Sequence, residues 1–154
     1  MAALAGEHFQ IADLLRRNGA DLDFQNAYGK TPLHGAAYSG NFEVVRILIE
    51  YNPADINARD TNGEIPLHWA STGHGFKDGS TIRLLLEHGA DINAQSEQCW
   101  TPLHVASVSG ALEVVHLLLE RGADVEVNDN SGKTALQIAA NDEIAKLLRK
   151  HGAK

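Results

Sequence analysis

Apolar residues recur with a helical period in the segment that ends at Gly122. Leu112, Val115 and Leu118 lie three residues apart, so they share one side of a helix, and the pattern does not fit the alternation of a strand. We therefore predict a helix over about 111–120. Gly122 ends it, because glycine readily adopts the left-handed conformation found at helix C-termini.

A shorter helix is predicted just before this one. Thr101 is a good N-cap, and Pro102 suits the first turn, where no backbone N–H is needed. Gly110 marks its end. The polar segment 124–132 after the second helix is rich in Asn, Asp and Gly, which favours extended chain closing in a tight turn. One unit is thus a turn, a short helix, a longer helix and an extended finger.

This unit is repeated along the chain. Similar tetrapeptides begin at four positions along the chain. They are Thr-Pro-Leu-His at 31 and 101, Ile-Pro-Leu-His at 65 and Thr-Ala-Leu-Gln at 134. An Ala-Asp pair keeps the same step at positions 20, 54, 90 and 123. Self-similarity at a period of about 33 residues indicates a solenoid whose units bury their apolar faces against one another.

The motif Thr-Pro-Leu-His-x-Ala at this period resembles the ankyrin-repeat family, from about Ala2 to the C-terminus. The resemblance implies an all-α fold, a solenoid of about five stacked helix-turn-helix units joined by β-hairpin-like finger turns. We expect one domain over 1–154. Its predicted units are residues 1–25 (a partial unit or N-terminal cap), 26–59, 60–95 with a loop insertion, 96–128, and 129–154 as a shortened C-terminal cap.

Several units depart from the repeat. The first lacks the tetrapeptide, which leaves open a natural cap or a chain cut from a longer protein. In the third, extra residues fall in the Gly-rich segment 71–80, where Phe76 is either an exposed anchor or folded back over an apolar edge. In the last, we expect three residues of the interhelical turn to be missing, and the polar finish suggests that the chain stops near a true end.

Cys99 stands where other units have Gly29, Gly63 and Gly132. That turn position often needs a positive φ, so we expect either a reshaped turn or a small strain. As the single cysteine, Cys99 excludes an intrachain disulfide and fits a reducing compartment.

The overall charge narrows the classes of partner. A net charge of −7 argues against nucleic acid, which requires a positive face. No apolar run is long enough to span a membrane, and the N-terminus lacks the features of a signal peptide. We therefore expect a monomer in the cytoplasm or nucleus, with neither a nucleic-acid nor a membrane partner.

The repeated histidines His34, His68 and His104 do not predict a metal site. Zinc ligands converge on one ion, whereas repeat equivalents lie one per unit along a stack. The ankyrin resemblance assigns them to a hydrogen-bond network with the motif threonine, which Ile65 should weaken in the third unit. No nucleophile elbow, phosphate loop or paired Cys-x-x-Cys is present. We expect no metal, no cofactor and no enzymatic activity.

The expected function is protein–protein interaction. The ankyrin resemblance places binding residues on the finger tips and first helices, which form a concave face. Carried over by register, the candidate partner-binding residues are Tyr28, Lys30, Tyr38, Arg59, Asn62, Glu64, Glu97, Gln98, Trp100, Val108 and Lys133. Trp100 is interpreted as a partner contact, with packing on a neighbouring finger as the alternative. Trp69 is interpreted as inter-repeat packing that fills the space left by Gly35.

Two rival functions and one modification stay open. The chain could be a structural or engineered scaffold without a natural ligand, or the regulatory or targeting domain of a larger enzyme or signalling protein. Irregular unit lengths weigh against a consensus design. The ankyrin resemblance also raises β-hydroxylation of Asn57 or Asn93, whose plain role is to pin the finger turn.

Overall fold

The computed structural model describes residues 17–19, 21, 24–51, 55–75 and 78–154, and over these residues the chain is all-α, with no β-strand. The described helices are α2 (Pro32–Tyr38), α3 (Phe42–Tyr51), α4 (Pro66–Ala70), α5 (Ser80–Glu87), α6 (Pro102–Val108), α7 (Leu112–Glu120) and α8 (Asp142–Lys150). The predicted unit 1–25 lies largely outside the described residues. None of the described helices is both long and apolar enough to cross a bilayer.

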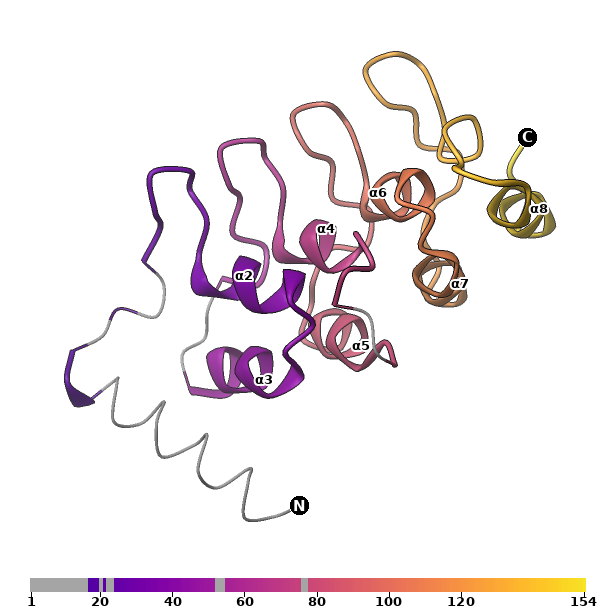
Figure 1. Cartoon of the computed structure of the whole chain (residues 1–154). Helices are drawn as coiled ribbons and strands as arrows, with labels where there is room; N and C mark the ends of the chain where they lie inside the picture. Colours follow the sequence, from indigo (N-terminus) through magenta and orange to yellow (C-terminus); the bar gives the residue numbers. More distant parts are fainter. Residues whose placement is uncertain (1–16, 20, 22–23, 52–54, 76–77) are drawn as a thin grey trace.

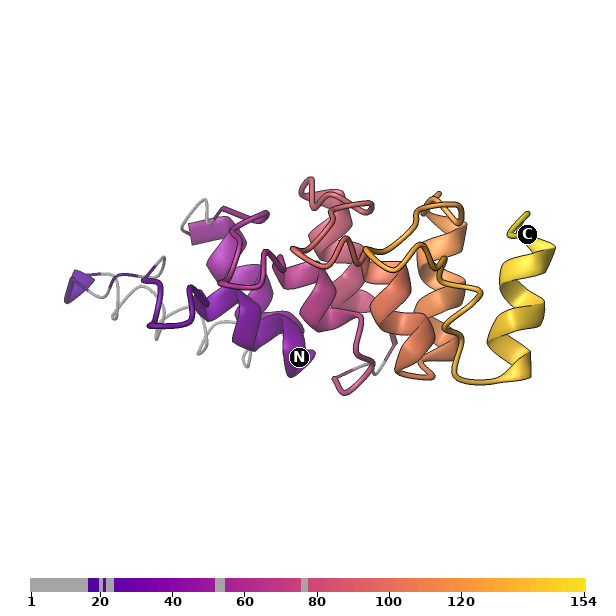
Figure 2. The same ribbon diagram turned by 90° about the horizontal axis from the view of Figure 1, so that it is seen from above.

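The helices form antiparallel pairs that stack in a row. Helix α2 packs on α3, α4 on α5 and α6 on α7, while α2, α4 and α6 follow one another along the stack. Helix α8 packs on α7 at the C-terminal end. Extended fingers project from one side of the row (Figure 1), and the view from above shows an elongated body (Figure 2).

Each first helix starts as the tetrapeptide predicts. Proline occupies the first helical turn of α2, α4 and α6. In α6 the Thr101 hydroxyl accepts a hydrogen bond from the His104 backbone N–H at 3.4 Å. Gly40 and Gly110, after α2 and α6, have φ of 62° and 74°, the left-handed conformation that ends a helix without steric strain.

The core consists of repeat-equivalent aliphatic side chains. Leu33, Leu67 and Leu103 from the tetrapeptides are at most 1% exposed, and Leu85 and Leu118 of the second helices are fully buried. Burying one leucine side chain contributes about 1.5–3 kcal/mol to the free energy of unfolding. Because these leucines pack within and between helix pairs, each pair depends on its neighbours.

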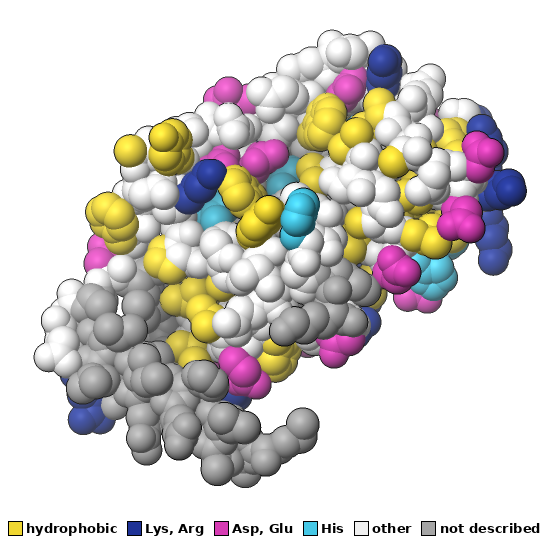
Figure 3. All heavy atoms as spheres, in the orientation of Figure 1, with side chains coloured by type: hydrophobic (Ala, Val, Ile, Leu, Met, Phe, Trp, Pro, Cys, Tyr) yellow, Lys and Arg dark blue, Asp and Glu magenta, His cyan; other side chains and the backbone are white. Residues whose placement is uncertain are grey.

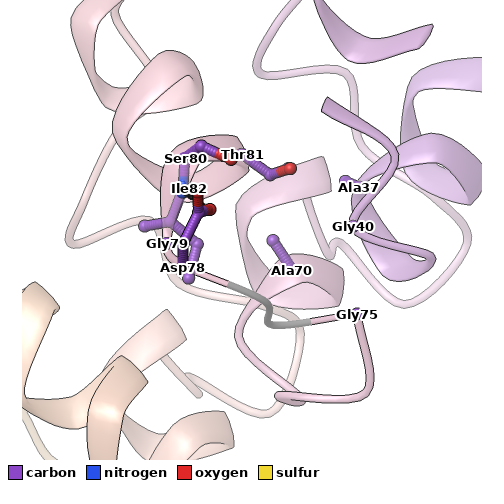
Figure 4. A pocket seen from close by; sticks show the side chains of 9 residues that line it. All are labelled: Ala37, Gly40, Ala70, Gly75, Asp78, Gly79, Ser80, Thr81 and Ile82. Carbon is purple, nitrogen blue, oxygen red and sulfur yellow. Dashed lines mark hydrogen bonds between the residues drawn. The ribbon is translucent and has the colours of Figure 1, made fainter. Parts of the chain in front are cut away.

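The insertion lies between α4 and α5, as the repeat lengths predict, while Phe76 lies outside the described residues. Its Gly75 rests directly on the turn after α2, since a Cβ there would collide with the Gly40 nitrogen. Figure 4 shows the small hollow that the two glycines line together with Ala70 and the start of α5. The loop is therefore packed against the preceding unit along this part of its length.

The predicted form of the last unit was wrong in one respect. We expected the deletion to shorten the interhelical turn, but residues 135–138 form turns and no first α-helix. Ala135 replaces the proline of the other units, and the shortened segment leaves no room for two helical turns before Asn141. Asn141 caps α8, its side-chain oxygen accepting from the Ile144 N–H at 3.0 Å. The second helix of this unit is α8.

Cys99 keeps the conformation of the glycines it replaces. Its φ is 58°, close to 70°, 71° and 75° at Gly29, Gly63 and Gly132. Of the two expectations, the strained turn is therefore correct and the reshaped turn is wrong. The left-handed region disfavours a residue with a Cβ by about 1–2 kcal/mol.

This strain predicts opposite effects for two substitutions. Cys99→Gly should raise the free energy of unfolding by up to about 1 kcal/mol, since released strain is partly offset by a more flexible unfolded chain. Gly132→Ala should lower it by about 1–2 kcal/mol, although its Cβ would meet no atom within 4 Å. Urea denaturation measures both. Equal effects of the same sign would contradict the strained turn.

Candidate protein-binding face

The fingers and the first helices α2, α4 and α6 line one side of the stack, which we call the finger face (Figure 1). One backbone hydrogen bond joins each finger tip to the next: Thr61 N–H to Tyr28 O at 3.0 Å, Glu97 N–H to Asn62 O at 2.9 Å, and Asn130 N–H to Gln98 O at 3.0 Å. These bonds hold the candidate residues at the tips in a fixed register.

A buried histidine also links each first helix to the next finger. His34 Nδ1 accepts from the Thr31 backbone N–H at 3.1 Å, and its Nε2–H donates to the Glu64 carbonyl at 3.1 Å. His68 and His104 repeat the arrangement, with Nε2 at 2.9 Å from Trp100 O and 3.2 Å from Lys133 O. Because Nδ1 accepts and Nε2 donates, the geometry assigns one neutral tautomer to all three imidazoles.

Burial lowers the pKa of His34, His68 and His104, because desolvation disfavours the charged ring, although the backbone carbonyls oppose this effect. Both nitrogens of each ring are already occupied by hydrogen bonds. In the described part of the chain, no group of three or more His, Cys, Asp or Glu could hold a metal ion. The three histidines thus serve the scaffold.

Ile65 weakens this network as expected, by one contact. The hydroxyls of Thr31 and Thr101 lie 2.9 Å from Nδ1 of their histidines, and Ile65 offers no hydroxyl to His68. The Ile65 backbone N–H still donates to His68 Nδ1 at 3.2 Å, so the link to the next finger persists.

All of the predicted partner-binding residues have surface on the molecule. Exposed side chains are those of Tyr28, Tyr38, Arg59, Asn62, Glu97, Gln98, Val108 and Lys133, while Lys30, Glu64 and Trp100 are half-buried. The structure brings Tyr28, Lys30 and Tyr38 together at the N-terminal end of the face and spreads the others along it.

One of these residues has a structural task as well, and another lies in a partly desolvated setting. Arg59 donates from one guanidinium nitrogen to Gly63 O at 2.9 Å and Gln95 O at 2.8 Å, and so connects two fingers. Burial raises the pKa of Glu64, with a smaller effect of Asp60 in the same direction and an opposing one of Lys30. Glu64 is therefore an acidic group in a partly desolvated setting.

Trp100 packs on the neighbouring finger. Its indole Nε1–H donates to Asp129 Oδ2 at 3.3 Å, and its ring stacks on His104 with a centroid distance of 6.4 Å. These contacts fit the packing alternative and leave part of the ring exposed on the finger face. A contact between Trp100 and a partner stays a prediction.

Trp69 lies at the centre of an aromatic cluster between two units. Its ring meets Tyr38 of the preceding first helix edge-on at 5.8 Å, and Lys30 Nζ lies 4.0 Å from its centroid. Tyr38 also stacks on His74 of the insertion at 5.1 Å. Inter-repeat packing of Trp69 is thus confirmed. The space beside Gly35, however, is open, since a Cβ there would meet no atom within 4 Å.

That open space belongs to a solvent-accessible hollow. Its empty volume is ≈ 640 Å³, which includes open solvent, and Phe24, Lys30, Gly35, Tyr38 and Trp69 contribute to its lining. Hydrophobic side chains gather beside the fingers on the face drawn in Figure 3, with a basic side chain among them. Phe24, 61% exposed, was missed by the sequence analysis because it precedes the turn tip to which the register points.

Asn57 and Asn93 connect successive units. Asn57 Nδ2 donates to Gly89 O at 3.0 Å, and its side-chain oxygen accepts from the Asp91 N–H at 2.9 Å. Asn93 accepts in the same way from the Asp124 N–H at 2.9 Å. The two asparagines therefore pin the next unit rather than their own turn, and hydroxylation stays an untested expectation.

Known proteins share this sequence pattern. A sequence family described as "Ankyrin repeats (3 copies)" matches residues 1–96 and 75–154. The chain is 37% identical over 70 residues to human "BCL-6 corepressor-like protein 1", covering 46% of this chain and 4% of that protein. It is 38% identical over 102 residues to "Putative E3 ubiquitin-protein ligase XBAT35" of Arabidopsis thaliana, covering 66% of this chain and 22% of that protein. The chain thus spans a small part of either relative.

The buried neutral histidines predict a loss of stability in mild acid. Their folded pKa lies below the unfolded value of about 6.5, so the unfolded chain binds more protons between the two. Their contribution is complete above about pH 6.5 and declines as the pH falls toward the folded pKa. Urea denaturation between about pH 5 and 7.5 measures the slope.

His104→Gln provides the matched variant, because Gln137 already fills this position in the last unit, where its side-chain oxygen accepts from the Thr134 N–H at 2.8 Å. The variant should keep the cap and show a shallower pH slope. If the stability of the variant depends on pH as steeply as that of the unmodified protein, His104 does not contribute to the loss of stability in acid.

Gly35 predicts a gain of stability. Gly35→Ala should raise the free energy of unfolding by about 0.5–1 kcal/mol, because alanine favours the helix interior and its Cβ enters open space. Gly75→Ala is the matched control, since its Cβ would collide with the backbone of Gly40, and it should destabilise. Thermal melts of both variants test the packing, and a destabilising Gly35→Ala would be inconsistent with an open site.

Proposed function

This chain belongs to the ankyrin-repeat family, and on that premise we propose that it is an interaction module that binds a protein partner through its finger face. The ankyrin repeat is a non-catalytic interaction fold, and its members generally bind proteins. The observation that carries the proposal is the position of the exposed aromatic side chains. Phe24, Tyr28 and Tyr38 are 61%, 65% and 39% exposed, and all three lie at the N-terminal end of this face.

The energetics favour this end as the centre of binding. Tyrosine and tryptophan dominate interface hot spots, where truncation to alanine commonly costs at least about 2 kcal/mol. Tyr38 and Trp69 are held by edge-on contact and by Lys30, so little side-chain freedom is lost when a partner binds. The remaining candidates, from Arg59 to Lys133, extend the surface along the stack.

The finer architecture forms part of the proposal. We propose about five units, a monomer in the cytoplasm or nucleus, and a partner that is neither nucleic acid nor membrane. The net charge of −7 supports the exclusion of nucleic acid. No catalytic role is proposed. The uneven units and the strained Cys99 argue against a consensus scaffold without a ligand.

A second candidate function is the targeting domain of a larger protein. It is favoured because the chain matches only 4% and 22% of the two relatives described above, one of which is named a putative ubiquitin ligase. In that setting the finger face would select the protein on which the remainder of the larger protein acts. The binding chemistry proposed for the face is the same in both cases.

Quantitative affinity purification from cells of the source organism tests the proposal. The double variant Tyr28→Ala/Tyr38→Ala should deplete the specific partner at least about tenfold, the equivalent of about 1.4 kcal/mol. Val44→Ala is the control, since Val44 is 37% exposed on α3, away from the fingers. A partner retained by the folded double variant and lost with Trp100→Ala would move the centre to the middle fingers. Retention by both would place binding off this face.

A further inference from the structure

The hollow between α2, α4 and the first described finger has walls that suit one large apolar side chain. Phe24, Tyr38 and Trp69 supply aromatic surface, and Gly35 of α2 leaves the floor open. Rings of this kind gain most from contact with another apolar or aromatic group in an offset or edge-on arrangement. The hollow is open to solvent, so a side chain of an extended peptide can enter it without a change in the backbone.

The charge around the hollow determines which charged residue of the peptide can lie next to that apolar side chain. Of the described residues in its lining, Lys30 alone carries a charge, because the imidazole of His34 is neutral and hydrogen-bonded on both nitrogens. Lys30 Nζ contacts the rings of Trp69 at 4.0 Å and Tyr28 at 5.6 Å. Among the described residues no carboxylate forms an ion pair with it.

Two carboxylates lie nearby, and Lys30 attracts that of Glu64, since it opposes the rise of the Glu64 pKa. Asp60 is buried, Glu64 is half-buried, and neither lines the hollow, so the charged group that faces an incoming peptide is Lys30. A second cation entering beside Lys30 would lose its hydration next to a like charge, which disfavours it at an interface. A carboxylate at the rim would instead pair with Lys30.

From this geometry we propose, on the premise that the finger face binds a protein, that the hollow takes an aromatic or large aliphatic side chain of an extended peptide segment, with an acidic residue beside it paired to Lys30. The partner is thus distinguished by an acidic-apolar motif. The ammonium already held over Trp69 excludes a basic anchor from this position. The preference is local and does not follow from the net charge of the chain, which is negative.

Selection from a displayed library of random twelve-residue peptides against the whole chain tests this preference. We expect the enriched peptides to share a large apolar residue next to Asp or Glu. The affinity of the best peptide, measured by fluorescence anisotropy, should fall at least tenfold with Gly35→Leu, which fills the hollow, and with Lys30→Glu, which reverses the charge. Val44→Ala should leave it unchanged.

The variants separate loss of binding from loss of folding. Leucine favours a helix more than glycine does, and the site of its Cβ is open, so Gly35→Leu should melt no lower than the unmodified chain. Lys30→Gln, in parallel, should weaken binding less than Lys30→Glu, because it removes the charge without reversing it.

Each of the other possible outcomes overturns a particular part of the proposal. Enriched peptides whose anchor is Lys or Arg would overturn the charge preference. Peptides that bind Gly35→Leu as tightly as the unmodified chain would overturn the hollow as the site and leave the proposed function standing. If the folded chain enriches no peptide at all, both this inference and peptide binding by the finger face are contradicted.

Discussion

The buried histidine of each first helix is the interaction on which the remaining architecture depends. Its Nδ1 accepts from the backbone at the start of its own helix, and its Nε2 donates to a carbonyl at the base of the next finger. One side chain thereby sets both where a helix begins and where the next unit lies. The ring is buried and both its nitrogens are bonded, so moving a finger would leave a desolvated polar group without its partner. The repeat can vary only where this link is not disturbed.

That constraint explains at which positions the units differ in sequence. The position before the tetrapeptide carries Lys30, Glu64, Trp100 and Lys133 in successive units. The backbone carbonyls of the last three each accept the bond from the histidine of the preceding unit. Side chains there can differ in charge and size, because the link uses the backbone carbonyl and not the side chain. A common backbone therefore presents a different surface at each step, which is the property that an interaction module requires.

Much of this could be predicted from the sequence, since the tetrapeptide specifies caps, helix starts and period together. The predicted position of the deletion in the last unit was wrong, because a count of residues shows how many are missing but not which element is shortened. The hollow at Gly35 was missed for another reason. It depends on how Trp69 of the next unit orients its ring against Tyr38 and Lys30. The orientation of a ring against another unit has no signal in the local pattern.

Fluorine NMR of the chain labelled with 5-fluorotryptophan shows whether binding is centred at the aromatic end of the finger face. The two tryptophans, Trp69 and Trp100, give two signals that a Trp100→Phe variant assigns. Titration with N-acetyl-aspartyl-phenylalanine amide should shift the Trp69 signal and leave that of Trp100 in place, while the lysyl-phenylalanine analogue should shift neither. A response of Trp100 alone, or a stronger response to the lysyl compound, would contradict the account.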